Sequence, residues 1–561
     1  MGAVRATDGD IYMLNQFSTK AASADTPKED MKAWWFTSPT DKTAIATGSV
    51  SYSVINGTSN ALLMKMNADG SYDWVVYSSD GDISNPQALA ATADGGVVMS
   101  IKYRHTNKPA TGTALEIVDA KGKATTFTKD YSEWSTTSRF YRNAIVKVSK
   151  DGVVEWVKHI DFKDRMKDAD SHITDGLDID ALASDEAGNI YAAFSTAETV
   201  FVRNTNDDQT TELTIEPRWT AEFGNDWTQS PAGGSYILKL DATGKTLAQF
   251  ASTSTATAAY EKYFGLEAKD GKLYAFAKLK GKAEETLTVN YGDKAVTNST
   301  LGTDEIVTFS LNTSDMKTVN WARMFYCKPI STKKGTNFRT LQLWDNSLYI
   351  VLGSTGSWAD TPDGEALYTA VNASREGAVL KISAADGTTQ KAYHSSKTMS
   401  YFSVVPQGDN LLAYNYDGAL DLFDAEGNIT NTWTLAKGKT MGTTATTVLD
   451  QSNVLALVRS RQEFDVNGMT FTTVTNWGLL AALYDTSSFF PTSGVESVDA
   501  SQFSAIGKVG AVEITASAPT TVHVFAISGQ VVASQNVAEG TTTIALPAGF
   551  YIVNGKKVAV R

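Results

Sequence analysis

The sequence predicts an all-β fold, a β-propeller of about seven four-stranded blades followed by a small C-terminal β-sandwich. Two observations predict it. A unit of strand, polar Asp/Gly turn and aromatic strand recurs through the first 490 residues, and a second hairpin follows each copy. A separate all-β segment then closes the 561-residue chain, which is too long for one ordinary core. We therefore expect a propeller over residues 3–490 and a sandwich over residues 495–561.

Each repeat opens with a strand that ends in a polar turn and continues as an aromatic-rich strand. The clearest copy is residues 181–194, where Asp185 and Gly188 precede Ile190 and Tyr191. Asp and Gly are typical of turns because Asp bonds the turn backbone and Gly tolerates positive φ. The other copies lie at residues 8–13, 92–98, 269–276, 344–351, 407–412 and 450–455.

A second hairpin completes each repeat. Strand, turn, strand, gap, strand, turn and strand together make one propeller blade. The copies are spaced by roughly 40 to 90 residues, against about 40 to 50 for ordinary blades, so insertions must supply the excess. A stacked array of sandwiches is the alternative architecture. The second hairpins lie at residues 61–70, 144–152, 236–244, 306–311, 378–383, 420–427 and 479–485.

The repeat also resembles a known family. The run Gly188-Asn189-Ile190-Tyr191, followed by the strand 238–241 and Gly244, is similar to the bacterial seven-bladed β-propeller repeats abbreviated SBBP. The similarity spans most of residues 3–490, and it implies a propeller.

The last 65 or so residues have a pattern of their own, in a length that suits a small sandwich of the immunoglobulin-like kind. A strand around 522–532 turns at Ser528-Gly529, and the closing strand turns at Asn554-Gly555, a strong hairpin signal. This succession resembles the C-terminal sorting domain of Bacteroidetes proteins exported by the type IX secretion system. The resemblance implies contact with that export machinery and a secreted or outer-membrane cell-surface location. Residues 1–7 hold no apolar signal segment, so we expect a mature form with a replaced start.

Most of the extra length falls between the second and third strands of the blades. Connections between these two strands lie on one side of a propeller, so we expect the insertions to crowd a single face. Strand-like runs within them indicate ordered loops. The insertions are residues 20–59, 104–142, 198–233, 280–303 and 354–376.

Several insertions place aromatic residues among polar ones. Flat aromatic faces stack on sugars or peptides while polar neighbours hydrogen-bond them, so these residues are candidates for ligand binding. The alternative is that they pin long loops onto the propeller. The candidates are Trp34, Trp35, Trp134, Tyr141, Trp219, Phe223, Trp227 and Trp358.

Other classes of function find little support. A formal net charge of −13 disfavours a nucleic-acid surface. The single Cys327 is expected to be buried, and the five histidines are too scattered for a metal site. Asp178 with Asp180, or the polar run 204–208, would offer oxygen ligands to Ca²⁺ but neither matches a calcium loop. We expect no catalytic residue, metal or cofactor, no transmembrane segment, and a monomer.

These observations favour a non-catalytic, exported protein that binds a glycan or a protein through its insertion-rich face. The first alternative is a glycan-degrading hydrolase or lyase on the same propeller, which would need two carboxylates at a defined separation. The second alternative is a structural surface protein. The sequence does not identify the ligand.

Overall fold

The computed structural model describes most of the chain as antiparallel β-strands. The described residues are 2–17, 29–34, 47–52, 60–68, 72–80, 83–104, 113–128, 142–162, 178–196, 199–204, 211–216, 234–254, 260–281, 284–298, 304–329, 337–372, 375–398, 400–415, 419–435, 437–438, 443–448, 453–460, 463–466, 469–472, 478–486, 489, 503–526, 531–553 and 556–561. They divide into two compact units, Met1–Phe489 and Phe490–Arg561. Among these residues, no helix has the length and apolar character needed to cross a bilayer.

The first unit is a β-propeller, as predicted. Its described strands form seven successive sheets, in which strands A, B, C and D pair in chain order. The seventh contains three described strands. In order, the sheets are β1 (Gly2–Arg5), β2 (Ile11–Phe17), β5 (Asn60–Met66), β6 (Tyr72–Asp80); β7 (Ile83–Ala91), β8 (Val97–Arg104), β11 (Arg142–Val148), β12 (Val154–Phe162); β13 (Asp178–Ser184), β14 (Ile190–Ser195), β17 (Ser235–Leu240), β18 (Thr246–Ala251); β20 (Tyr260–Lys269), β21 (Lys272–Lys280), β24 (Glu305–Asn312), β25 (Val319–Pro329); β26 (Asn337–Trp344), β27 (Ser347–Ser354), β29 (Glu376–Ser383), β30 (Thr389–Thr398); β31 (Tyr401–Gln407), β32 (Asn410–Asn415), β33 (Ala419–Phe423), β34 (Ile429–Thr434); and β36 (Thr443–Val448), β37 (Asn453–Ser460), β40 (Gly478–Asp485).

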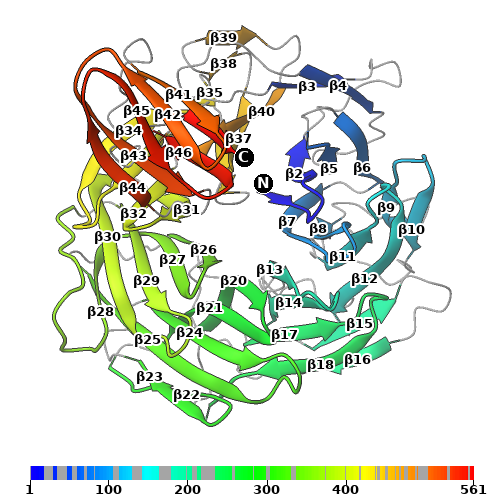
Figure 1. The fold of residues 1–561 in the computed structure, drawn as a ribbon. Helices are drawn as coiled ribbons and strands as arrows, with labels where there is room; N and C mark the ends of the chain where they lie inside the picture. Colours follow the sequence, from blue (N-terminus) through cyan, green and yellow to red (C-terminus); the bar gives the residue numbers. More distant parts are fainter. Residues whose placement is uncertain are drawn as a thin grey trace. The chain divides into compact units, whose positions relative to one another are not determined.

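The seven sheets follow one another around a ring. Each A strand contacts the A strand of the next sheet, in the order β1, β7, β13, β20, β26, β31 and β36, and β36 contacts β1 again. Figure 1 shows A strands such as β7, β13, β20 and β26 toward the centre and later strands toward the rim. The contact of β36 with β1 closes the ring, so we call the sheets blades 1 to 7.

The insertions lie between strands B and C, as predicted, but the described parts do not simply crowd one face. The hairpin β9 (Thr113–Val118)–β10 (Ala124–Thr128), inserted in blade 2, pairs with β6 of blade 1. The hairpin β15 (Val200–Asn204)–β16 (Thr211–Ile215), inserted in blade 3, pairs with β12 of blade 2. The short β28 (Gly356–Ala359), inserted in blade 5, pairs with β25 of blade 4.

Each of these insertions therefore extends the outer edge of the preceding blade. An outer strand carries unpaired backbone groups, and pairing with an inserted strand satisfies them. The hairpin β3 (Glu29–Trp34)–β4 (Thr47–Tyr52), inserted in blade 1, contacts β40 of blade 7. Because blade 7 precedes blade 1 in the closed ring, this insertion also lies against the preceding blade. Two insertions instead pair with a short strand that follows the preceding blade: β22 (Thr288–Tyr291) and β23 (Lys294–Thr297) with β19 (Thr253–Ser254), and β38 (Glu463–Val466) and β39 (Met469–Thr472) with β35 (Lys437–Gly438).

The repeated aspartates act in turns, as predicted. In the A–B turn of blade 3, Asp185 Oδ1 accepts hydrogen bonds from the amides of Ala187 at 3.0 Å and Asn189 at 2.8 Å. Gly188 follows with φ of +82°, a left-handed conformation that favours glycine. Asp119, Asp241 and Asp424 bond their turns in the same way.

Tryptophans on three D strands tie neighbouring blades together. The Trp156 indole in β12 lies against the C–D turn of blade 3, where its Nε1 donates to the Ala242 carbonyl at 2.9 Å. The ring covers Gly244 so closely that a Cβ on this glycine would lie 2.7 Å from Trp156. Blade packing here therefore depends on a glycine that has no side chain. The equivalent contacts are Trp74 with Gly152 and the Lys150 carbonyl, and Trp321 with Gly387 and the Ala384 carbonyl.

The second unit consists of two facing sheets around one core. One sheet has the order β41 (Phe503–Lys508), β42 (Ala511–Ala516), β45 (Gly540–Ala545), and the other has β44 (Val531–Val537), β43 (Thr520–Ala526), β46 (Gly549–Val553), β47 (Lys556–Val560). Val512 and Ile514 from the first sheet are fully buried with Val522 and Val553 from the second. Val553 of β46 pairs with Lys556 of β47, and the predicted Asn554-Gly555 turn lies outside the described residues.

Candidate functional site

For most of the candidate ligand-binding aromatic residues, the side chains lie outside the described part of the structure. Trp34 ends β3, but its side chain is not among the described ones. The others outside the described residues are Trp35, Trp134, Tyr141, Trp219, Phe223 and Trp227. These remain predictions from sequence, and Trp358 is the one candidate with a described side chain.

Trp358 is a core residue rather than a ligand-binding one. Its ring is fully buried in the hydrophobic cluster between blades 4 and 5, next to Cys327 on the neighbouring strand. Its Nε1 donates to Ser354 Oγ at 2.9 Å. A buried ring has no free face for stacking, so the alternative interpretation, an aromatic that pins its loop, holds here. Cys327 is buried as predicted.

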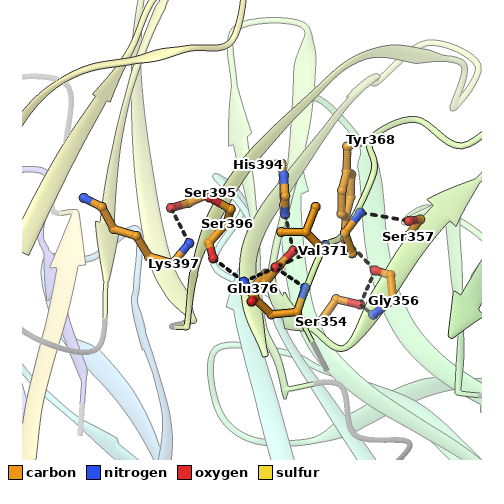
Figure 2. Close-up of polar contacts among 12 residues, drawn as sticks. Ser354, Gly356, Ser357, Tyr368, Val371, Glu376, His394, Ser395, Ser396 and Lys397 are labelled. Atoms are coloured by element: carbon orange, nitrogen blue, oxygen red, sulfur yellow. Dashed lines mark hydrogen bonds and ion pairs between the residues drawn. The ribbon is translucent and has the colours of Figure 1, made fainter. Parts of the chain in front are cut away.

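The same insertion is held by a buried carboxylate at the start of β29. Glu376 is fully buried, and its oxygens accept from His394 Nε2 at 2.6 Å and from the Asn372 amide at 2.7 Å. The Asn372 side-chain amide donates at 2.6 Å. The Val371 amide adds a longer contact to Glu376, which lies beside His394 in Figure 2. Glu376 therefore holds the end of the insertion at the point where strand β29 begins.

An aromatic residue of the insertion completes this cluster. The Tyr368 ring stacks on the His394 ring, with centroids 4.5 Å apart and planes inclined by 15°. Its hydroxyl donates to the Gly356 carbonyl at 3.1 Å. Burial raises the pKa of Tyr368 well above its ordinary value, so the hydroxyl stays protonated. A carboxylate that orients a histidine supplies two of the three members of a nucleophilic triad. Here the same carboxylate instead fixes the backbone of the loop.

A second polar cluster joins strands of blades 2, 3 and 4. Asp178, the first residue of β13, receives Lys102 Nζ at 2.5 Å on one oxygen and Lys262 Nζ at 2.9 Å on the other. Gln87 Nε2 donates to it at 3.1 Å. Burial acts to raise the pKa of Asp178, but Lys262 and Lys102 together lower it. Two ammonium groups occupy this carboxylate, so it does not suit the calcium role considered from sequence; no metal-type cluster occurs among the described residues.

The described histidines have structural contacts. His159 is buried in β12, where Nδ1 bonds the Tyr103 hydroxyl at 2.9 Å and the ring stacks on Phe127 at 3.7 Å. His523, in the C-terminal unit, lies 3.0 Å from Ser534 Oγ through Nδ1. Both fit the structural role expected from their scattered positions.

A cavity lies among the short turns of the propeller. Its volume is about 470 Å³, and residues of blades 5, 6 and 7 line it. Trp344 and Asp345 come from the A–B turn of blade 5, Gln407 and Gly408 from that of blade 6, and Asp485 from the end of β40. Sequence reasoning missed this cavity because each contribution looks like an ordinary turn. A tryptophan directly before the Asp345 turn was the available signal.

Comparisons with known proteins do not assign this chain to a family. No family model matches the chain, and no curated protein sequence matches it. Among solved structures, BamB from Moraxella catarrhalis has 12% sequence identity and a TM-score of 0.29, covering 79% of this chain and 96% of that chain. A protein of unknown function from Bacteroides caccae has 8% identity and a TM-score of 0.28, covering 72% and 93%. One from Dyadobacter fermentans has 12% and 0.30, covering 71% and 93%. The propeller assignment rests on strand topology and not on these likenesses.

Proposed function

We propose that this chain is an exported, non-catalytic binding protein that presents a glycan- or protein-binding surface on the insertions between strands B and C of its propeller. The observation that carries the proposal is the anchoring of the insertions. Hairpins such as β9–β10 and β15–β16 are built into the edge of the neighbouring blade instead of standing free.

Anchored insertions suit recognition for a physical reason. Binding costs the free energy needed to order the contacting loops, and a loop that is already ordered at its base loses less. Binding residues are also concentrated on loops that a rigid scaffold positions. In this chain β15–β16 is fixed on β12, and the segment 217–233 that follows it carries Trp219, Phe223 and Trp227.

We expect replacement of the tryptophans in this segment to weaken ligand binding. A glycan array probed with the full chain should give a defined set of bound glycans, and the double variant Trp219→Ala with Trp227→Ala should lose at least tenfold in affinity for them, because each stacking contact contributes about 0.5–1.5 kcal/mol beyond its buried area. Phe550→Ala, which removes an aromatic ring that is 70% exposed in the C-terminal unit, is the matched control.

Equal binding by the double variant and the wild type would remove this segment from the site. Release of free sugar from a bound glycan would support the hydrolase or lyase alternative instead.

We also propose that the C-terminal unit directs export. Truncation after Gly494 should leave the propeller folded, since the unit Met1–Phe489 has its own cores, and should abolish delivery to the cell surface. Circular dichroism of the truncated protein and fractionation of the producing cells would measure the two effects. Unfolding of the truncated propeller would mean that the two units fold as one.

A further inference from the structure

Lysines occupy one repeated position in the C strands, two residues before the C–D turn begins. In blades 1 to 3 the ammonium group is used by the protein itself. Lys65 Nζ bonds Asp10 and Asp73, Lys147 Nζ bonds Asp94 and Thr92, and Lys239 Nζ bonds the Thr313 carbonyl, all within 3.0 Å.

Blade 5 has the same lysine without such an acceptor. Lys381 is opposite Tyr349 of β27 in the sheet, as Lys239 is opposite Tyr191 of β14. Its ammonium group lies 5.8 Å from the centre of the Tyr349 ring, and the residue lines the cavity. Within the described part of the chain, no hydrogen bond or ion pair joins the Lys381 ammonium group to another residue. The lysine ammonium group, which is hydrogen-bonded within the protein in blades 1 to 3, thus lines a cavity in blade 5.

Among the described residues, Tyr349, which pairs with Lys381, also lacks the hydrogen bond that the equivalent tyrosines of blades 1 and 3 make. The Tyr12 hydroxyl donates to the Gly95 carbonyl at 2.6 Å, and the Tyr191 hydroxyl donates to Asp185 at 2.8 Å. No described residue takes the corresponding hydrogen bond from Tyr349, which also lines the cavity. Burial, Tyr393 and Asp345 raise the pKa of Tyr349, so its hydroxyl remains a donor at any physiological pH.

The rest of the lining adds acceptors and an aromatic wall. Asp345 and Asp485 bring carboxylates, Gln407 brings an amide that both donates and accepts, and Trp344 brings an indole ring. The lining therefore includes one ammonium group and two carboxylates. A volume of about 470 Å³ falls within the range of about 300–1,000 Å³ that is typical of small-molecule sites.

We propose that this cavity, the turn-side pocket, binds a neutral sugar residue through Lys381, Tyr349 and Trp344. Sugar hydroxyl groups accept from the lysine and tyrosine donors and also donate to the carboxylates, and a sugar ring packs on an indole face. An anionic ligand would meet two carboxylates against one ammonium group, and an apolar ligand would leave the donors unpaired at a cost. None of the residues that line the pocket belongs to an insertion, so this site does not depend on the function proposed above.

The test is saturation-transfer NMR on the full chain with glucose, galactose, mannose and N-acetylglucosamine, followed by calorimetric titration of those that bind. At least one neutral sugar should bind. Lys381→Met should weaken it about tenfold or more, because a hydrogen bond from a charged donor is lost, and Tyr349→Phe should weaken it several-fold. Glucuronate and galacturonate should bind less tightly than their parent sugars.

The controls separate binding from folding. Lys381→Met should leave the unfolding temperature unchanged, whereas Lys147→Met at the equivalent position of blade 2 should lower it, since its side chain is 1% exposed and paired with Asp94. Absence of binding by every sugar, tighter binding of the uronates, or unchanged binding by a folded Lys381→Met variant would each overturn the proposal.

Discussion

Gly244→Ala is expected to destabilise the propeller far more than Gly188→Ala, although both glycines have φ of +82°. A left-handed conformation costs an alanine about 1–2 kcal/mol at either position. At Gly188 the new Cβ meets only the Ala242 Cβ, at 3.7 Å, but at Gly244 it would lie 2.7 Å from Trp156. Overpacking adds about 1–3 kcal/mol there. Urea denaturation followed by far-UV circular dichroism would measure the difference.

A double-mutant cycle shows whether the indole is the cause. In a Trp156→Ala background the clash is absent, so Gly244→Ala should then cost about as much as Gly188→Ala. The two Gly→Ala variants having equal effects in the wild-type chain would contradict the packing of Trp156 on the next blade. Leu247→Ala, at a side chain that is 49% exposed on β18, should change the free energy of unfolding by less than about 0.5 kcal/mol.

Glu376→Ala is expected to lower the free energy of unfolding by about 3–5 kcal/mol, because it removes the acceptor of several hydrogen bonds and each buried donor left unpaired costs about 1–3 kcal/mol. The substitution would leave the donors of Asn372 and the ring of His394 without their acceptor. The insertion that Glu376 anchors should then open locally, and trypsin should cleave after Arg375 faster than in the wild type.

Glu365→Ala is the matched control for this prediction, because Glu365 belongs to the same insertion but is exposed. It should leave both the stability and the cleavage rate near those of the wild type. A Glu376→Ala protein as stable and as resistant to trypsin as the control would mean that the cluster in Figure 2 does not hold the loop.

Features that depend on neighbouring residues were predictable from the sequence, and features that depend on long-range contacts were not. The turns were predictable because Asp185 and Gly188 act within five residues of chain, and their chemistry is local. Trp358 was misassigned because exposed and buried tryptophans in a polar loop look alike in sequence. Only the pairing of β28 with β25 brings this ring into the core.

The turn-side pocket was hidden for a related reason. Lys381 looks identical in sequence to Lys147 and Lys239, and its difference lies in the acceptors that surround it. Those acceptors come from other turns of the chain, so the free donor becomes visible only when the blades are assembled.

By itself, the sequence determined the all-β class, the strands and turns of the repeat, and the position of the insertions, because alternation and turn chemistry act over a few residues. The tertiary structure alone decided that an insertion pairs with the preceding blade, that Trp156 covers Gly244, and that Lys381 faces a cavity. Each of these joins residues far apart in the chain, and only closing the ring of blades brings them into contact.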